Sequence, residues 1–243
     1  MTTPFFTDLQ TRARGFLSGI AQEDSLISGA VLVSASYDEA AFSDALFAQL
    51  DIPQPSTLSR AVPRRKAEFL AGRAMTQAAM AGLGLPPRPV DTTPSRAPLW
   101  PEGLSGSISH ARGRCACLLS QDTGRSFGID TEAIAEGRSL DAILSQTLSP
   151  DERALLTQGP HPTNTNATLA FSAKEALFKA LYPQVGRHFG FDAAELTDPP
   201  GDTSLALSLT TSLTETLPKG RRFDIHLRCT STHILTWLAV PTP

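Results

Sequence analysis

The C-terminal part of the sequence contains three runs in which apolar side chains recur at every second position. They stand at 205, 207 and 209, at 223, 225 and 227, and along 234–240. A period of two is that of a β-strand with one face on a core, so these runs predict an antiparallel meander. Strands followed by helices and then by more strands favour an α+β fold over a doubly wound parallel sheet.

The rest of the chain extends this pattern. Further strands are predicted at 30–34, 106–109, 114–120 and 126–132, and helices at 38–50, 63–82, 141–148, from Ser149 onward and around Lys174. The strands at 114–120 and 126–132 are predicted to form a hairpin that turns around Asp122 and Gly124. Residues 1–25 look helical or loosely ordered, and 159–166 predicts a loop. A strand–helix–strands order in each half predicts two lobes.

Composition excludes several classes of protein. The 243 residues carry a net charge of −3, so bulk electrostatics do not indicate a nucleic-acid-binding protein. The three cysteines include no Cys-x-x-Cys pair, which excludes a disulfide framework and a zinc site. No apolar stretch approaches the roughly 20 residues of a membrane span, and the first residues do not resemble a signal peptide. We therefore expect a cytoplasmic protein that does not enter membranes.

The segment 171–182 carries a carboxylate between two lysines. On a helix, Glu175 and Lys179 lie four residues apart on one face, with Lys174 beside them. In a phosphate-handling site such a carboxylate holds a cation or takes a proton, while lysines neutralise phosphate oxygens. The same letters also fit an ordinary helix in which Ser172 and Glu175 form a capping box and Glu175 pairs with Lys179.

A second acidic motif lies in the strand predicted at 126–132. Because side chains alternate along a strand, Asp130 and Glu132 project from one face, roughly 7 Å apart at their Cα atoms. This gap suits one hard cation held between two carboxylates, although an exposed strand face could also carry the pair. With Glu175 the motif supplies three carboxylates, enough to hold Mg²⁺ while leaving positions for water and phosphate oxygens.

Basic residues gather on the helix predicted at 63–82. Lys66 and Arg73 are seven residues apart and nearly eclipsed, and Arg65 adjoins them. Arg96 follows in a Pro-rich loop. Such a cluster is costly to hold together unless an anion lies among the charges, whereas its simpler interpretation is a solvated basic face. His110, at the end of the predicted strand 106–109, could donate to a phosphate or have a structural role.

The order of these elements resembles the 4′-phosphopantetheinyl transferase family, which activates carrier proteins of fatty-acid, polyketide and nonribosomal peptide synthesis. The resemblance covers about residues 60–183 and is strongest to the two-lobed branch associated with the siderophore enterobactin. Its motifs stand here as the basic helix 65–73, Ser109-His110, Gly128-Ile129-Asp130-Thr131-Glu132 and Lys174-Glu175-x-x-x-Lys179. Each motif alone is common, but four in the right order are specific.

The resemblance implies two pseudo-symmetric α+β lobes, 1–124 and 125–243, with coenzyme A in the cleft between them. The first lobe is expected to surround the 3′-phosphate and adenine with Arg65, Lys66, Arg73 and Arg96. Ser109 and His110 are expected to contact coenzyme A as well, with His110 reaching a phosphate. The second lobe is expected to hold Mg²⁺, or alternatively Mn²⁺, through Asp130, Glu132 and Glu175. Lys174 and Lys179 would bind phosphate oxygens, and Glu175, directly or through a metal-bound water, would take the proton of the acceptor serine.

The reaction implied is transfer of 4′-phosphopantetheine from coenzyme A to a serine of an apo acyl or peptidyl carrier protein, by a monomeric enzyme. The branch favours siderophore or nonribosomal peptide assembly, with polyketide synthesis as another destination. Two alternatives stay open from the residues alone: a metal-dependent phosphodiesterase or nuclease, and a catalytically silent coenzyme A-binding protein. Ser109 and His110 adjoin each other on a predicted strand and therefore point to opposite faces, which argues against a serine hydrolase built on this pair. The absence of a phosphate-binding Gly-x-x-x-x-Gly-Lys loop excludes a P-loop kinase.

Overall fold

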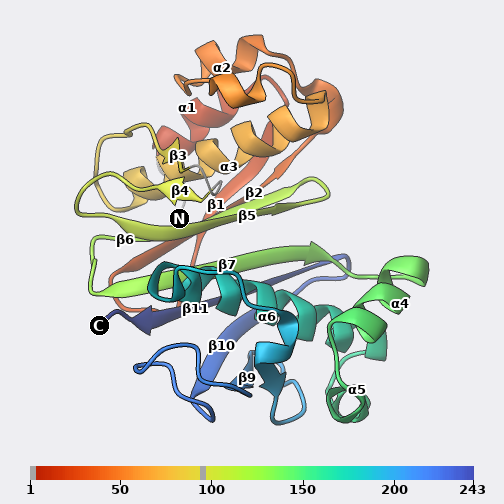
Figure 1. The fold of residues 1–243 in the computed structure, drawn as a ribbon. Helices are drawn as coiled ribbons and strands as arrows, with labels where there is room; N and C mark the ends of the chain where they lie inside the picture. Colours follow the sequence, from red (N-terminus) through yellow and green to blue (C-terminus); the bar gives the residue numbers. More distant parts are fainter. Residues whose placement is uncertain (1–3, 94–96) are drawn as a thin grey trace. The chain divides into compact units, whose positions relative to one another are not determined.

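The chain folds into two compact units, Met1–Thr123 and Gly124–Pro243, in a computed structural model that describes residues 4–93 and 97–243 (Figure 1). Each unit combines an antiparallel sheet with one long helix, so the predicted α+β class is confirmed. None of the helices in the described ranges is long and apolar enough to cross a membrane.

The first unit is built on a four-stranded sheet with the order β1-β2-β6-β5. Its strands are β1 Leu17–Glu23, β2 Ala30–Tyr37, β5 Ser105–Ala111 and β6 Arg114–Ser120. A small second sheet pairs β3 Asp91–Thr92 with β4 Pro98–Leu99. The helices of this unit are α1 Pro4–Arg12, α2 Ala45–Gln49, α3 Pro63–Gly82 and the 3₁₀ turns Glu39–Ala41 and Ser56–Leu58.

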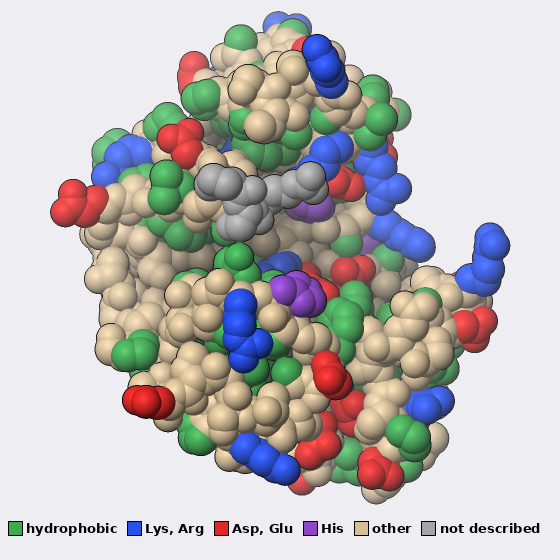
Figure 2. All heavy atoms as spheres, viewed as in Figure 1, with side chains coloured by type: hydrophobic (Ala, Val, Ile, Leu, Met, Phe, Trp, Pro, Cys, Tyr) green, Lys and Arg blue, Asp and Glu red, His purple; other side chains and the backbone are tan. Residues whose placement is uncertain are grey.

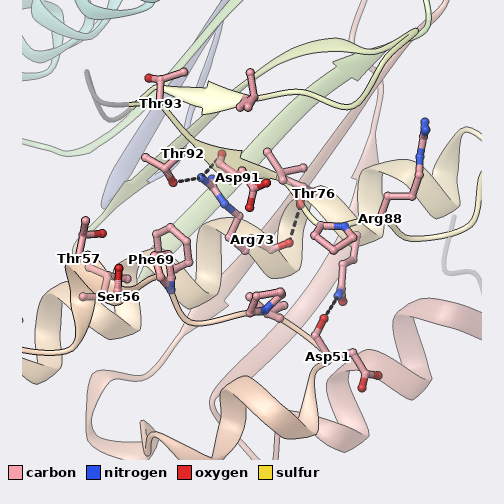
Figure 3. A pocket seen from close by; sticks show the side chains of 18 of the residues that line it. Asp51, Ser56, Thr57, Phe69, Arg73, Thr76, Arg88, Asp91, Thr92 and Thr93 are labelled. Atoms are coloured by element: carbon pink, nitrogen blue, oxygen red, sulfur yellow. Dashed lines mark hydrogen bonds between the residues drawn. The ribbon is translucent and has the colours of Figure 1, made fainter.

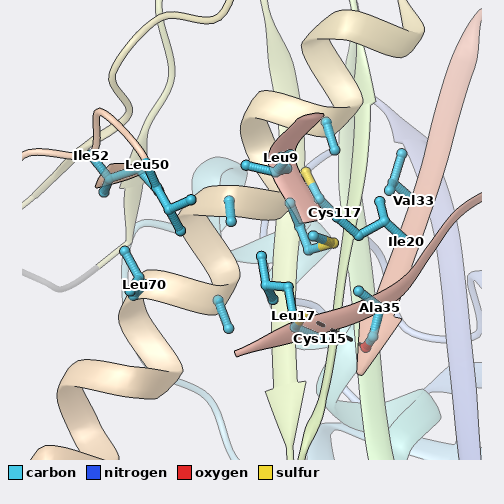
Figure 4. Close-up of a cluster of buried hydrophobic side chains, with 14 of the residues drawn as sticks. Leu9, Leu17, Ile20, Val33, Ala35, Leu50, Ile52, Leu70, Cys115 and Cys117 are labelled. Atoms are coloured by element: carbon cyan, nitrogen blue, oxygen red, sulfur yellow. Dashed lines mark hydrogen bonds between the residues drawn. The ribbon is translucent and has the colours of Figure 1, made fainter. Parts of the chain in front are cut away.

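Helix α3 forms the centre of the first unit because it presents an apolar face to the sheet. It begins at Pro63, whose fixed φ and missing N–H suit a first helical position, and ends at Gly82, as predicted. Leu70 of α3, Leu17 of β1, and Cys115 and Cys117 of β6 belong to one buried cluster (Figure 4). The two cysteines therefore serve as small core residues.

The second unit is built on a five-stranded sheet with the order β7-β11-β10-β9-β8. Its strands are β7 Arg125–Ala133, β8 Ala194–Leu196, β9 Ser204–Leu209, β10 Arg222–Cys229 and β11 His233–Pro241. Its helices are α4 Gly137–Gln146, α5 Pro150–Leu156, α6 Thr163–Val185 and the 3₁₀ turn Phe191–Ala193. The predicted meander is confirmed, because β9, β10 and β11 follow one another in antiparallel pairing.

The predicted hairpin and the predicted helix at 38–50 are wrong. The strands β6 and β7 do not form a hairpin, because β6 pairs with β2 and β5 whereas β7 pairs with β11. The turn signals at 122–124 instead mark the boundary between the units. The helix predicted at 38–50 is divided into a 3₁₀ turn and the short α2. Within residues 1–25 the structure places α1, and also β1, which the sequence did not predict.

Helix α6 begins much earlier than its sequence suggests. The segment predicted as a loop supplies its first turn from Thr163, preceded by Pro162. Asn164 donates to the carbonyl of Ala135, and Asn166 donates to the carbonyls of Leu156 and His161. These tertiary contacts stabilise residues with low helix propensity. Ser172 therefore lies in the middle of α6, and its interpretation as the cap of a helix is wrong.

Candidate functional site

Three side chains of α6 point at strand β7 from one helix face. Ser172, Glu175 and Lys179 recur at intervals of three and four residues, and residues at these spacings line one side of a helix. The strand opposes them with Gly128, Asp130 and Glu132, which share one face because the pairing of β7 with β11 is regular. Gly128 leaves no room for a side chain beneath the helix, so α6 approaches the strand backbone closely.

Asp130 is the most constrained carboxylate of this face. It is 4 % exposed, and its Oδ1 accepts a hydrogen bond from Lys179 Nζ at 2.7 Å. Lys179 also donates to the carbonyl oxygen of Ile129 at 3.0 Å. The Oδ2 atom of Asp130 accepts from Ser172 Oγ at 2.8 Å. The carboxylate is therefore fixed from both sides, by a charge on one oxygen and by a hydroxyl on the other.

Glu175 lies beside Asp130 in a partly buried position. Burial raises the pKa of Glu175, and the negative charge of Asp130 raises it further, while Lys179 and His188 act in the opposite direction. Two carboxylates that repel each other in a partly desolvated place favour either a bound cation or a proton on one of them. Glu175 also borders a cavity of about 170 Å³ whose aromatic wall consists of Phe178, His188, Phe189 and Phe191.

The third predicted ligand, Glu132, faces the same side of β7 and is partly buried. In residues 4–93 and 97–243, no group of three or more His, Cys, Asp or Glu side chains lies close enough together to hold a metal ion. The donor set still has the chemistry of a magnesium site, because carboxylate oxygens are the hard ligands that Mg²⁺ prefers. The charge repulsion between Asp130 and Glu175 fits a cation there. The metal assignment stays a prediction.

Lys174 differs from its expected position. Its ammonium group is buried and donates to the carbonyls of Thr147 and Phe191, at 2.9 and 3.2 Å, and to Glu152. The shortest Lys174–Glu152 distance is 2.8 Å, and both side chains are under 5 % exposed. An ammonium has three N–H donors, and these contacts use all of them. Lys174 therefore connects α6 to the start of α5 and to the Phe191 turn instead of presenting a charge to a phosphate.

In the first unit, a pocket of about 900 Å³ lies beside α3 and receives the Arg73 side chain (Figure 3). The guanidinium donates to Thr92 Oγ1 at 2.9 Å and to the carbonyl of Asp91 at 3.1 Å. It also stacks over Phe69, with 4.6 Å between Cζ and the ring centroid. Arg73 Nε is buried without a hydrogen-bond partner, and burial lowers the pKa of Arg73 to about 10. Both observations indicate a cation that an anion in the pocket would stabilise.

The other predicted anion-binding residues are only partly brought to this pocket. Arg65 lines it together with Arg73, and an Arg65 NH group lies 3.4 Å from His110 Nε2. Ser109 is buried next to His110 on β5. Lys66 instead pairs with Asp44, at 2.9 Å, and is not among the pocket's lining residues. Arg96 lies outside the described residues.

On the face seen in Figure 2, lysine and arginine side chains are interspersed with acidic ones. This agrees with the small net charge of −3.

Sequence reasoning missed four residues that contact the site residues. Ser172 had been interpreted as a cap, and Thr236 and His188 come from segments far along the chain from Asp130. Glu152 forms a capping box with Ser149 at the start of α5. The box carried no sign that the same carboxylate pairs with Lys174.

Comparisons with known proteins agree with the motifs. Residues 54–120 match the 4′-phosphopantetheinyl transferase N-terminal domain, and residues 126–228 match the 4′-phosphopantetheinyl transferase superfamily. The chain is 37% identical over 202 residues to the 4′-phosphopantetheinyl transferase Svp of Streptomyces mobaraensis, covering 80% of each chain. It is 36% identical to enterobactin synthase component D of Salmonella typhi, covering 60% of each chain. It is 33% identical to the 4′-phosphopantetheinyl transferase PptT of Mycobacterium tuberculosis, covering 68% of this chain and 77% of the relative. The chain belongs to the 4′-phosphopantetheinyl transferase superfamily.

Proposed function

We propose that this phosphopantetheinyl transferase depends on Mg²⁺ held by Asp130, Glu132 and Glu175 when it transfers phosphopantetheine from coenzyme A to a carrier-protein serine. The observation that carries the metal proposal is the juxtaposition of Asp130 and Glu175, whose charges repel each other in a partly buried place. Bound Mg²⁺ would offset the charge that develops on the pyrophosphate oxygens. Mn²⁺ could take the place of Mg²⁺, because it also prefers carboxylate oxygens as ligands.

The bond changes in this transfer are simple. The serine oxygen attacks the phosphorus that carries the pantetheine arm, and the bond from that phosphorus to the bridging oxygen breaks. Adenosine 3′,5′-bisphosphate leaves, and the serine proton passes to a base. Glu175 is the proposed base, directly or through a metal-bound water, because it lies on the face of α6 that carries Lys179 and stands beside Asp130.

Lys179 is proposed to bind a phosphate oxygen. Its side chain is 28 % exposed, so its ammonium can contact Asp130 and still approach a ligand. Lys174 has no such freedom, since its three donors are used inside the unit. We therefore assign Lys174 the task of holding α6 in place, and leave phosphate binding to Lys179.

The nucleotide end of coenzyme A is assigned to residues of the first unit. Arg73 offers a buried guanidinium with one unpartnered N–H, and Arg65 borders the same pocket. His110 lies against Arg65, and Ser109 precedes it on β5. These positions support binding of the 3′-phosphate by arginine, whose several N–H donors suit phosphate oxygens.

The acceptor is proposed to be an apo peptidyl or acyl carrier protein of siderophore or nonribosomal peptide synthesis. Support comes from relatives named enterobactin synthase component D. Three free thiols suit a reducing compartment such as the cytoplasm. We propose that the enzyme acts there as a monomer. Purified apo carriers from siderophore and fatty-acid synthesis, offered side by side, would distinguish a dedicated enzyme from a broad one.

One assay tests the metal proposal. The protein is incubated with coenzyme A, Mg²⁺ and an apo carrier, and the carrier is weighed by mass spectrometry for the intact pantetheinyl group. Asp130→Ala should lose about 10³-fold in rate, roughly 4 kcal/mol of transition-state stabilisation. Asp224→Ala, which removes an exposed strand carboxylate of β10, is the matched control and should keep its rate. A folded Asp130→Ala protein of near-normal activity would remove the metal assignment. A carrier that wild type leaves unmodified would show that this carrier is not its acceptor.

A further inference from the structure

Two hydroxyl groups behind Asp130 form a buried chain of hydrogen bonds. Ser172 Oγ lies 2.8 Å from Asp130 Oδ2, and Thr236 Oγ1 lies 2.8 Å from Ser172 Oγ. Ser172 and Thr236 are both fully buried. The three residues belong to β7, α6 and β11, and Thr236 stands directly opposite Asp130 in the strand pairing.

The direction of this chain follows from the number of protons available. A carboxylate without a proton only accepts, so Ser172 must donate its single hydroxyl proton to Asp130. The second contact of Ser172 then needs Thr236 as its donor. The order is Thr236 to Ser172 to Asp130, and each donor polarises the next. Thr236 thus strengthens a bond in which it takes no direct part.

The position of Ser172 is unusual for a serine inside a helix. Such hydroxyls commonly bond the carbonyl one turn back, as Thr168 of the same helix does to Asn164 at 2.7 Å. Ser172 instead donates its hydroxyl proton to Asp130 of strand β7. The Ser172 hydroxyl is therefore bonded to a carboxylate of the candidate site and not to the backbone of its own helix.

We propose that Ser172 and Thr236 are positioning residues that hold the Asp130 carboxylate in one orientation for a divalent metal ion. This inference rests on the proposed function, since it takes Asp130 as a metal ligand. An oxygen that accepts one hydrogen bond keeps a second lone pair for a cation, so the contact does not compete with the metal. When Lys179 turns to a phosphate, the Ser172 bond still holds the Oδ2 atom of Asp130.

Metal binding without coenzyme A provides a readout separate from activity. The probe is Mn²⁺, titrated into the full-length protein and followed by electron paramagnetic resonance. Ser172→Ala should weaken Mn²⁺ about tenfold, the lower end of what loss of an outer-shell partner costs. Thr236→Val, which keeps side-chain volume and shape, should weaken Mn²⁺ by less. Because Thr236 acts through Ser172, the double variant should bind Mn²⁺ no more weakly than Ser172→Ala.

Thr131→Val is the matched control. Like Ser172 and Thr236, Thr131 of β7 carries a buried hydroxyl group. This hydroxyl donates to the carbonyl of Ile234 at 2.9 Å and points to the other face of the strand. Its removal should lower the melting temperature about as much as Thr236→Val does and leave Mn²⁺ affinity unchanged.

The outcomes separate the two levels of the proposal. If Asp130→Ala abolishes Mn²⁺ binding while Ser172→Ala and Thr236→Val keep wild-type affinity, the hydroxyl chain is only structural and the inference is overturned. If Ser172→Ala does not fold, Thr236→Val decides, because it leaves helix α6 untouched. If the wild type binds no Mn²⁺, or Asp130→Ala binds it equally well, the proposed metal site is wrong and this role falls with it.

Discussion

A Cβ atom on Gly128 would lie 1.9 Å from the carbonyl oxygen of Ala176, a distance that no real pair of such atoms keeps. Helix α6 therefore rests on the bare backbone of β7, and this contact brings Ser172, Glu175 and Lys179 within reach of Asp130. Any side chain at 128 must move the helix.

Gly128→Ala should lower the free energy of unfolding by at least about 1–3 kcal/mol, because a helix backbone cannot give way as a side chain can. Transferase activity should fall along with the displaced helix. Denaturant melts and turnover measurements would check this. Gly72→Ala is the comparison, because its added Cβ meets only the Ile108 side chain, at 3.0 Å. Equal behaviour of the two variants would contradict the close packing of α6.

Glu175→Gln should separate stability from function through pH. Burial, followed by the charge of Asp130, raises the pKa of folded Glu175 above its ordinary value of 4.5. The folded state then binds more protons than the unfolded state between these two pKa values, so stability is lost as pH rises through this window. Because glutamine does not titrate, Glu175→Gln should not lose stability in this way as pH rises. In melts run with EDTA, the variant should gain stability relative to wild type as pH rises. In assays run with Mg²⁺, the same variant should transfer little phosphopantetheine. The titration of Glu175 would be contradicted if the stabilities of wild type and Glu175→Gln changed in parallel with pH. Its role in the transfer would be contradicted if the variant kept full activity.

Lys174→Ala should be one of the most destabilising changes in the second unit. It leaves the buried Glu152 carboxylate without its counter-ion, a loss that typically costs about 3–5 kcal/mol. Adding Glu152→Gln should recover part of the loss, since no uncompensated charge then remains. Arg222→Ala, which breaks an exposed ion pair with Asp198, should have little effect in the same urea melts. A mild Lys174→Ala phenotype would mean that the ammonium is not held as the structure has it.

The coenzyme's 3′-phosphate should matter for binding more than for rate, because it is remote from the reacting pyrophosphate. We expect 3′-dephospho-coenzyme A to have a KM at least about tenfold higher, equivalent to roughly 1.4 kcal/mol. Arg73→Ala should reduce the ratio of the two KM values, because it removes the buried guanidinium. Lys66→Ala should leave that ratio unchanged, because Lys66 pairs with Asp44. Equal KM values for the two coenzymes with wild type would show that the arginine pocket serves another purpose.

The sequence predicts local features of this molecule well and long-range ones poorly. Helix α3 and the strand alternation that places Asp130 and Glu132 on one face follow from short-range rules, and both are present. The start of α6 at Thr163 does not, because contacts of Asn164 and Asn166 with distant carbonyls outweigh their low helix propensity. The partners of β6 and β7 were also missed. Turn residues mark a change of direction, but they do not say which strand lies beside which.

The position of β11 has a consequence for how the protein is made. Strand β7, which carries Asp130, pairs with β11, and β11 is the last strand of this unit to leave the ribosome. Every strand of the first unit's sheet lies before residue 121, so that sheet can close while the rest of the chain is still being synthesised. Strand β7, by contrast, stays without its partner strand until β11 has been synthesised, about a hundred residues later. We therefore expect nascent chains halted before β11 to protect the first unit from protease and to expose the second.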